Sequence, residues 1–316
     1  MTKVLITDAL DAAAVEVLRN AGHDVVIDEC DAVRLLQIVG GAEALLVRSR
    51  TKVTKEVIAA AQRLKVIGRA GVGLDNIDVE AAKAAGIRVV NAPESLTNAV
   101  AELTLGQMLN LSRSLARADA SMRAGKWEKK ELLGGELAGK TLGLLGIGRI
   151  GGRVADLARA FGMRIVAYDP YLNAQQVQAH GATKLETVDA VLERADFVSI
   201  HVPLTPETKG LLNAPRFARM KETAFVLNLA RGGIIDEKAL VDALDKGHIA
   251  GAALDVFEKE PPEASPLTRH PRIVLTPHVG GNTAEAQEKA GTMVAGQVVE
   301  ILSGKPATTR TRISGG

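Results

Sequence analysis

The stretch Gly146-Ile147-Gly148-Arg149-Ile150-Gly151 constrains the fold of this chain more than any other. The mostly apolar residues Thr141–Leu145 precede it and predict a buried strand, and residues 153–161 after it predict a helix. A second strand, Met163–Tyr168, leads into Asp169, close to the roughly 20-residue distance expected between such glycines and an acid. With 31 glycines in the chain the spacing alone is weak evidence, but this order of elements indicates a parallel βαβ unit.

These residues have separate tasks if the turn binds a dinucleotide. Gly146 permits the tight turn, Gly148 lets a pyrophosphate approach the backbone, and Gly151 lets the helix pack closely on the sheet. The phosphates then lie at the positive end of the helix dipole, where Arg149 adds a cation. Asp169 is expected to accept hydrogen bonds from the adenosine ribose. Because its charge opposes a 2′-phosphate and no arginine follows it directly, we expect NAD rather than NADP.

Strands and helices alternate along nearly all of the 316 residues, which predicts the α/β class with parallel sheets. The length of 316 residues favours two domains, and the 47% hydrophobic content supports large cores. We expect both domains to be doubly wound, one a Rossmann NAD-binding domain and the other a smaller, flavodoxin-like substrate domain. Asn91-Ala92-Pro93 marks a crossing between them, because a proline disfavours helix in the residue before it. We expect residues 1–97 and 285–316 to form the substrate domain and residues 98–284 the NAD domain.

Apolar periodicity places the individual elements. The predicted strands are 4–7, 25–27, 44–47, 66–67, 88–90, 141–145, 163–168, 197–201, 225–229, 250–256 and 273–276. The predicted helices are 11–20, 31–39, 55–61, 79–85, 98–117, 153–161, 188–194, most of 211–220, 236–246 and 284–302. The helix 98–117 is apolar on more than one face, so it must be buried, and a subunit interface is one way to bury it.

Charge and cysteine content limit the partners. The formal net charge is +2, no long run of one sign occurs and no 18-residue apolar stretch exists, so neither a nucleic acid nor a membrane is an expected partner. Cys30 is the single cysteine and cannot form an internal disulfide, which fits a reducing cytoplasm. No metal site is expected.

Polar residues gather where predicted strands end, which is where open α/β sheets bind ligands. Histidine suits the proton step of a hydride transfer, because its ordinary pKa of about 6.5 lies near working pH. His278 follows the last strand and is a candidate base, whereas His201 is expected to line the adenosine side. Glu258, Glu260 and Glu263 are equally good carboxylate partners by chemistry.

Three segments resemble signatures of the D-isomer-specific 2-hydroxyacid dehydrogenases: Leu229-Ala230-Arg231-Gly232-Gly233-Ile234-Ile235-Asp236, Ala252 to Pro261, and Thr276-Pro277-His278-Val279-Gly280-Gly281. The resemblance implies that Arg231 holds the substrate carboxylate and that His278 is the acid/base with Glu260 as its partner. The cofactor contacts that motif and resemblance together imply are Val72, Gly146, Gly148, Arg149, Ile150, Gly151, Asp169, His201, Val202, Pro203, Leu229, Ala230, Asp255, Gly280 and Gly281.

The resemblance also implies a small phosphorylated 2-hydroxy acid as substrate. The substrate-binding residues it implies are Arg48, Ser49, Arg69, Gly73, Asn76, Lys129 and Lys130, the two lysines reaching the site of a neighbouring subunit in a homodimer or homotetramer. Leu96 departs from the family pattern, which usually has a small polar residue there. Because the sequence stops soon after Gly304, we expect a short form without serine feedback.

Two other functions stay open at this stage. One is reduction of an unphosphorylated 2-oxo acid such as hydroxypyruvate or glyoxylate. The other is an NAD-sensing binding protein, since the family also resembles corepressors that keep the dehydrogenase frame.

Overall fold

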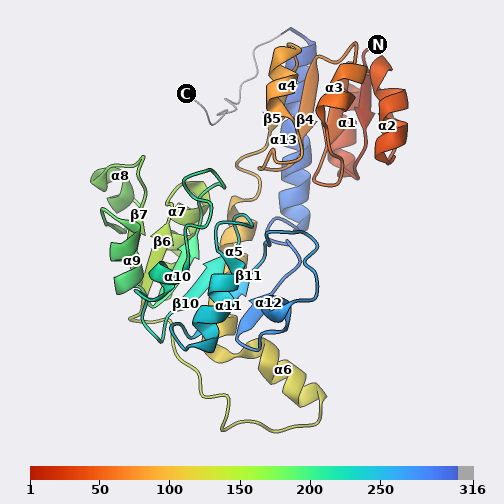
Figure 1. The fold of residues 1–316 in the computed structure, drawn as a ribbon. Coiled ribbons are helices and arrows are strands. Elements are labelled where there is room, and N and C mark those ends of the chain that lie inside the picture. The colour runs from red at the N-terminus through yellow and green to blue at the C-terminus, as the bar shows by residue number, and fades with distance from the viewer. Residues whose placement is uncertain (305–316) are drawn as a thin grey trace. The chain divides into compact units, whose positions relative to one another are not determined.

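The computed structural model describes residues 1–304 and divides the chain into two compact units (Figure 1). The first unit contains Met1–Leu96 and, of the described residues, those from Gly281 to Gly304, and the second contains Thr97–Gly280. Residues 305–316 of the predicted substrate domain lie outside the described residues.

The first unit has a parallel sheet of five strands within the described residues, in the order β2-β1-β3-β4-β5. This is the flavodoxin-like order, so the predicted class of this domain is confirmed. Its strands are β1 Lys3–Ile6, β2 Asp24–Ile27, β3 Ala44–Val47, β4 Val66–Arg69 and β5 Arg88–Asn91. Its helices are α1 Ala12–Asn20, α2 Ala32–Ile38, the 3-10 turn η1 Val39–Gly41, α3 Lys55–Ala60, α4 Val79–Ala84 and α13 Ala284–Leu302.

Each face of this sheet packs on its own apolar core. On one face α1 and α13 cover Val4, Ile6 and Leu46. On the other face α2, α3 and α4 cover residues that include Leu5 and Leu45. Alternate side chains of a strand point to opposite faces, so a strand covered on both sides is apolar at every position. The last helix was predicted to return to the first unit, and α13 does so by packing on α1 and β4.

The second unit has a parallel sheet of seven strands within the described residues, in the order β12-β11-β10-β9-β6-β7-β8. The predicted Rossmann order is observed, with one further strand at the edge of the sheet. The strands are β6 Thr141–Leu145, β7 Arg164–Tyr168, β8 Thr183–Lys184, β9 Phe197–Ile200, β10 Phe225–Asn228, β11 Gly251–Leu254 and β12 Ile273–Leu275. The helices are α5 Thr97–Arg113, α6 Leu115–Arg123, α7 Arg149–Ala160, α8 Ala174–Gln178, α9 Val188–Arg194, α10 Ala214–Phe217, α11 Glu237–Asp245 and α12 Pro266–Arg269.

Helix α5 packs against α7 and against β10, β11 and β12, so this apolar helix is largely buried within its own unit. Helices α9, α10 and α11 contribute to a large apolar core that includes Phe217, Leu240 and Leu244. Within residues 1–304 no helix has both the length and the apolar character needed to cross a bilayer.

The predicted helix 98–117 is interrupted at Ser114, whose φ of 50° is left-handed. The carbonyl of Ser112 accepts a hydrogen bond from Gly135 N at 2.8 Å, and Ala116 N instead donates to Asn110 Oδ1 at 2.9 Å. The helical hydrogen bond between residues 112 and 116 is thereby replaced, because a loop distant in sequence takes its acceptor. Helix α6 and the loop after it project away from the sheet of their unit (Figure 1).

Two further helix predictions were wrong at their ends. Helix α7 begins at Arg149 rather than 153, although it then contains Gly151 and Gly152. Packing explains this, since a Cβ on Gly152 would lie 2.6 Å from the ring of His180. In the predicted helix 211–220 only α10 is helical. The short elements α8, β8 and α12 were not predicted.

Candidate functional site

The glycine turn lies at the point where the strand order of the second unit reverses. Strand β6 has β7 on one side and β9 on the other, and the chain returns past β6 to form β9. Gly146 follows β6 with a φ of 88°, and a Cβ there would lie 2.8 Å from the carbonyl oxygen of His201 and 2.9 Å from Val202 Cγ1. His201 and Val202 thus border the turn at a topological switch point, the usual ligand-binding position in an open α/β sheet.

The three motif glycines meet different surroundings. A Cβ on Gly151 would lie 2.3 Å from the carbonyl oxygen of Gly146, so the first turn of α7 packs directly on the glycine turn. A Cβ on Gly148 would meet nothing within 4 Å. Gly148 is the N-cap of α7, and its exposed backbone faces open space at the positive end of the helix. The turn therefore fits a dinucleotide pyrophosphate.

Asp169 joins the ends of β6 and β7. Its Oδ2 accepts a hydrogen bond from Ile147 N at 3.0 Å, and its Oδ1 accepts one from Tyr171 N at 3.0 Å. The side chain is largely buried, and a carboxylate has further lone pairs for a ribose hydroxyl. Its negative charge is thus held against the backbone of the glycine turn itself.

His201 is unsuited to proton transfer near neutral pH. Burial lowers the pKa of His201 from its ordinary 6.5 to about 4. Its Nε2 lies 2.9 Å from Ser199 Oγ. A base works best when its pKa lies near the working pH. This imidazole is neutral near pH 7, so it lines the glycine turn and does not act as a base.

His278 and Glu260 lie together beyond the carboxyl ends of β12 and β11. His278 Nδ1 is 2.7 Å from Glu260 Oε2, and Glu260 Oε1 accepts a hydrogen bond from Phe257 N at 3.2 Å. His278 has a left-handed φ of 53°, and its side chain is half exposed. Of the three acids that chemistry left open, Glu258 contacts Glu237 N and Glu263 pairs with Lys259.

Asp255 holds the loop that carries His278. It is buried, and it accepts hydrogen bonds from Thr276 Oγ1 at 2.6 Å, Val279 N at 2.9 Å and Gly280 N at 2.8 Å. Its carboxylate was predicted to contact NAD, and the contacts found within the chain show that it also anchors residues 276–280. A Cβ on Gly280 would lie 3.0 Å from Asp255 Oδ2, so little room is left for a side chain beside this carboxylate.

Arg231 follows β10 in a turn held by a residue that sequence motifs did not indicate. Buried Asn228 donates from Nδ2 to the Arg231 carbonyl at 2.8 Å and accepts from Ala230 N at 3.1 Å. A Cβ on Gly232 would lie 1.8 Å from the carbonyl oxygen of Phe257, so the turn after β10 contacts the loop after β11. An asparagine that ends an apolar strand just before the arginine motif was the available signal.

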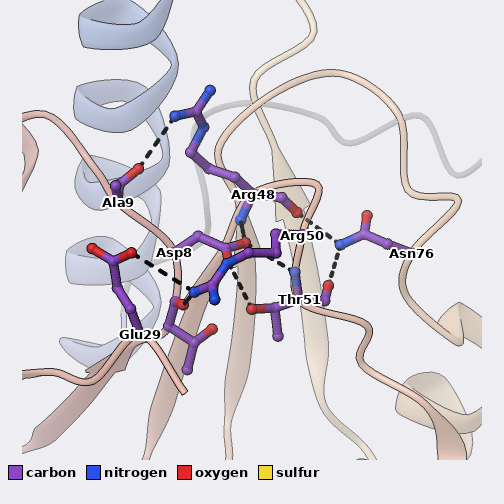
Figure 2. Close-up of polar contacts among 8 residues, drawn as sticks. Asp8, Ala9, Glu29, Arg48, Arg50, Thr51 and Asn76 are labelled. Carbon is purple, nitrogen blue, oxygen red and sulfur yellow. Dashed lines mark hydrogen bonds and ion pairs between the residues drawn. The ribbon is translucent and has the colours of Figure 1, made fainter. Parts of the chain in front are cut away.

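The first unit has a separate polar cluster at the carboxyl edge of its sheet, shown in Figure 2. The loop Arg48–Thr51 leaves β3 there and surrounds the carboxylate of Asp8, which follows β1. Asn76 Nδ2 donates to the carbonyls of Arg48 and Thr51, each at 2.7 Å. Because an amide NH₂ has two hydrogens, both donors of Asn76 are used within the loop. The predicted contact of Asn76 with substrate is thus open only to its oxygen.

Arg69 and the loop after β4 lie at the same edge of the first unit. A Cβ on Gly71 would lie 1.4 Å from Arg69 Nη1, so the guanidinium folds back over its own loop. The Val72 carbonyl accepts a hydrogen bond from Asn91 Nδ2 at 2.6 Å.

Leu96 lies beside Gly281, where a Cβ would be 2.7 Å from Leu96 Cδ1. The leucine that departs from the family pattern therefore occupies space that this glycine leaves.

The remaining predicted residues lie in loops and at the ends of strands and helices. Lys129 and Lys130 are exposed in the segment after α6. The loops after β3, β4 and β9 contain Ser49, Gly73 and Pro203, respectively. Buried Leu229 and partly buried Ala230 follow β10, and Arg149 and Ile150 begin α7. No cluster of three or more His, Cys, Asp or Glu side chains arranged to hold a metal occurs in residues 1–304.

Comparison with known proteins gives the class. Residues 105–280 match the NAD binding domain of the D-isomer specific 2-hydroxyacid dehydrogenases. The D-3-phosphoglycerate dehydrogenase of Methanocaldococcus jannaschii is 48% identical over 97% of this chain and 59% of its own length. The TT0316 protein from Thermus thermophilus is 38% identical with a TM-score of 0.90, over 98% of this chain and 100% of that one. A glyoxylate reductase from Paecilomyes thermophila is 31% identical with a TM-score of 0.89, over 98% of each chain.

The chain belongs to the D-isomer specific 2-hydroxyacid dehydrogenase family, and its second unit contains the NAD-binding domain of that family. It spans about three fifths of the length of the curated relatives that it matches.

Proposed function

We propose that this protein oxidises 3-phospho-D-glycerate to 3-phosphooxypyruvate with NAD, the first step of serine biosynthesis. The observation that carries the proposal is the contact of 2.7 Å between His278 and Glu260, at the same sheet edge as the glycine turn and Arg231. The identity to D-3-phosphoglycerate dehydrogenases over nearly the whole chain supports this substrate among the acids that the family uses.

The two side chains divide the proton chemistry. His278 accepts the hydroxyl proton on Nε2 while the carbinol carbon loses its hydride and the carbonyl bond forms. Glu260 accepts the hydrogen bond of Nδ1–H, which directs Nε2 toward the substrate and stabilises the imidazolium that results. Bound NAD supplies the acceptor for the hydride. In the reverse direction His278 returns the proton to the oxygen.

Arg231 is the proposed anchor for the substrate carboxylate, since a guanidinium binds a carboxylate through two parallel hydrogen bonds. The turn that presents it is fixed by Asn228 and by the contact of Gly232 with the chain after β11. A preset guanidinium loses less freedom when substrate binds. The same edge thus provides an anion anchor and a proton carrier.

Arg48, Ser49 and Arg69, at the carboxyl edge of the first unit, are the proposed phosphate ligands, with Gly73 and Asn76 in the same group of loops. Arg48 lies in the loop that Figure 2 shows held by Asp8 and Asn76, and its Nη1 donates to the Ala9 carbonyl at 3.4 Å. Lysine and arginine are the side chains that pair with phosphate most strongly. The predicted contacts of Lys129 and Lys130 with a partner's substrate remain part of the proposal.

We assign NAD rather than NADP because Asp169 lies against the glycine turn. A 2′-phosphate at about 4 Å from this carboxylate would cost about 4 kcal/mol per unit charge at an effective dielectric near 20. The remaining cofactor contacts are proposed as predicted, with Asp255 acting also through the loop that it anchors. A lower KM for NADP than for NAD would contradict the assignment.

A homodimer is the proposed assembly, with a homotetramer as its extension. The projecting segment from α6 onward exposes Leu115 (51%), Met122 (55%), Trp127 (78%) and Leu133 (95%). A pocket of about 630 Å³ adjoins its base, lined by residues that include Phe197, Phe225 and Ile273. Exposed apolar surface of this kind is typical of an association site. The cytoplasmic location predicted from the single Cys30 stays a prediction.

The second candidate function is reduction of an unphosphorylated 2-oxo acid, which the likeness to a glyoxylate reductase favours. A substrate panel followed by NADH absorbance separates the two functions. We expect 3-phospho-D-glycerate to give the highest kcat/KM, and faster turnover of glyoxylate or hydroxypyruvate would establish the second. In Arg48→Ala we expect KM for 3-phospho-D-glycerate to rise far more than KM for D-lactate, and an equal rise would remove the phosphate assignment.

A further inference from the structure

The loop Arg48–Thr51 is built around a single carboxylate (Figure 2). Asp8 Oδ2 accepts hydrogen bonds from Arg48 N at 2.5 Å and Thr51 N at 3.2 Å. Asp8 Oδ1 accepts from Thr51 Oγ1 at 2.7 Å and Arg50 Nε at 3.1 Å. Asp8 is 3% exposed, so these contacts replace almost all of its hydration. Both carboxylate oxygens therefore bind the backbone or side chains of one loop.

Arg50 supplies the counter-charge that such burial requires, since a buried carboxylate is costly unless it is paired and hydrogen-bonded. Besides its bond to Asp8, its Nη2 donates to the Thr7 carbonyl and lies 3.9 Å from Glu29 Oε2. Arg50 is thus engaged by two acids and a carbonyl of its own unit. Its charge neutralises Asp8 rather than adding to the positive potential at the sheet edge.

Asn76 completes the support from the other side of the loop. Its two N–H groups bind the carbonyls of Arg48 and Thr51, while Asp8 binds the N–H groups of the same two residues. The first and last residues of the loop are therefore each held by two side chains, Asp8 at the N–H group and Asn76 at the carbonyl. We call Asp8, Arg50 and Asn76 the loop clamp.

The loop clamp holds the backbone of Arg48 but not its guanidinium. The side chain of Arg48 extends away from Asp8 toward Ala9, whereas that of Arg50 turns back onto the carboxylate (Figure 2). The backbone of Arg48 is fixed without use of its guanidinium. A rigid base for a charged side chain lowers the ordering cost of binding, because fewer backbone states are lost when an anion is captured.

We propose that Asp8 is a positioning residue for anion recognition, which presets the backbone of Arg48 so that its guanidinium meets the phosphate of the substrate. This inference rests on the proposed function, because it requires Arg48 to be a phosphate ligand. It assigns Arg50 to charge compensation and Asn76 to loop support, and neither role follows from the family signatures.

The test is Asp8→Asn in the full chain, with steady-state kinetics in both single variants and in Asp8→Asn/Arg48→Ala. The amide presents an NH₂ group to donors that need an acceptor, so one side of the loop is released. We expect KM for 3-phospho-D-glycerate to rise about tenfold, with kcat and the KM for NAD within about twofold. In the Arg48→Ala background the same change should add less than about twofold, because residues that act as a unit are not additive.

Two further variants keep the test decisive. Asp28→Asn removes a carboxylate at the same sheet edge that pairs with Arg34 instead of the loop, and it should leave KM unchanged. If Asp8→Asn does not fold, Thr51→Val removes one donor to Asp8 at nearly constant volume and should raise KM about threefold, again only when Arg48 is present.

Equal factors with and without Arg48, or an unchanged KM in Asp8→Asn, would overturn the positioning role. Failure of the proposed function would appear differently, as a wild-type protein that does not reduce NAD with 3-phospho-D-glycerate.

Discussion

His278 shows how one residue depends on contacts that its neighbours in sequence do not provide. Its imidazole meets Glu260, and its loop is anchored by Asp255. Its φ of 53° is uncommon for a residue with a Cβ and is maintained by those contacts. Glu258, Glu260 and Glu263 have the same chemistry and lie in one loop, and they differ in which groups they contact in the fold.

Substitution of His278 should lower kcat more than substitution of Glu260. His278→Asn removes the proton carrier and is expected to lower kcat by about 10² to 10⁴-fold. Glu260→Gln keeps an oxygen toward Nδ1 but loses the charge that stabilises the imidazolium, so we expect a smaller loss, of about tenfold. NADH formation at saturating substrate measures both. Glu263→Gln is the matched control in the same loop, and an equal loss in that variant would contradict the assignment.

His201 should make stability depend on pH in a defined window. Burial lowers the pKa of His201 from 6.5 to about 4. Between these values the unfolded chain binds a proton that the folded chain does not, so the free energy of unfolding falls as pH falls from 6.5 toward 4. Above 6.5 both states are neutral at this residue, and its contribution is constant.

The variant His201→Gln isolates that contribution, because it keeps a side chain able to bond Ser199 and does not titrate. Urea unfolding at pH 7 and pH 5 should show a smaller loss of stability in the variant than in the wild type. The same loss in both proteins would mean that His201 is solvated enough to keep an ordinary pKa.

At the scale of elements, the packing of α7 distinguishes Gly151, which the fold needs, from Gly148, which we propose to bind the cofactor. Gly151 lies against the backbone of Gly146, whereas Gly148 has a φ of −70° and open space at its Cβ position. The motif in the sequence does not distinguish them. The packing of the helix on the turn does.

Alanine at Gly148 should therefore weaken NAD binding, whereas alanine at Gly151 should lower the stability of the fold. Gly148→Ala is expected to keep the thermal midpoint within about 2 °C but to raise KM for NAD at least tenfold, because the methyl group enters the space that we propose for the pyrophosphate. Gly151→Ala is expected to destabilise the protein by about 1 to 3 kcal/mol through overlap with Gly146. Calorimetry and NAD titration measure the two effects, and an unchanged KM in Gly148→Ala would place the pyrophosphate elsewhere.

The strands and helices predicted from the sequence agree with the structure where the apolar pattern of neighbouring residues determines them. The buried parallel strands were found because both faces of each strand are covered, which makes them short and apolar throughout. The interruption at Ser114 was missed, because it depends on Gly135 taking the carbonyl of Ser112. The start of α7 was placed too late, because glycines disfavour helix by themselves and are helical here through contacts with Gly146 and His180.

At the scale of the whole molecule, the projecting segment beyond α5 bears on assembly. We expect the wild-type protein to sediment as a dimer, since Trp127 and Leu133 are exposed apolar side chains on one segment. Trp127→Glu places a charge on that surface and should raise the dimer dissociation constant at least tenfold.

Tyr171→Glu is the control, because Tyr171 is 92% exposed on the loop after β7, away from this segment. Analytical ultracentrifugation across a concentration series compares the variants. A monomeric wild-type protein, or equal dissociation in the two variants, would rule out this surface as the dimer interface.

The linear sequence by itself determined the strand and helix alternation, the glycine turn with its acid, and the polar residues that end the strands, because each depends on neighbouring residues and on a fixed period. By chemistry Glu258, Glu260 and Glu263 were equal as partners of His278, and the family resemblance pointed to Glu260. Only the tertiary structure brings that carboxylate within 2.7 Å of the imidazole. It also decided that Asp8 and Asn76 hold the loop of Arg48 between them. These partners come from distant segments, and no local pattern specifies which side chains packing will bring within hydrogen-bonding distance.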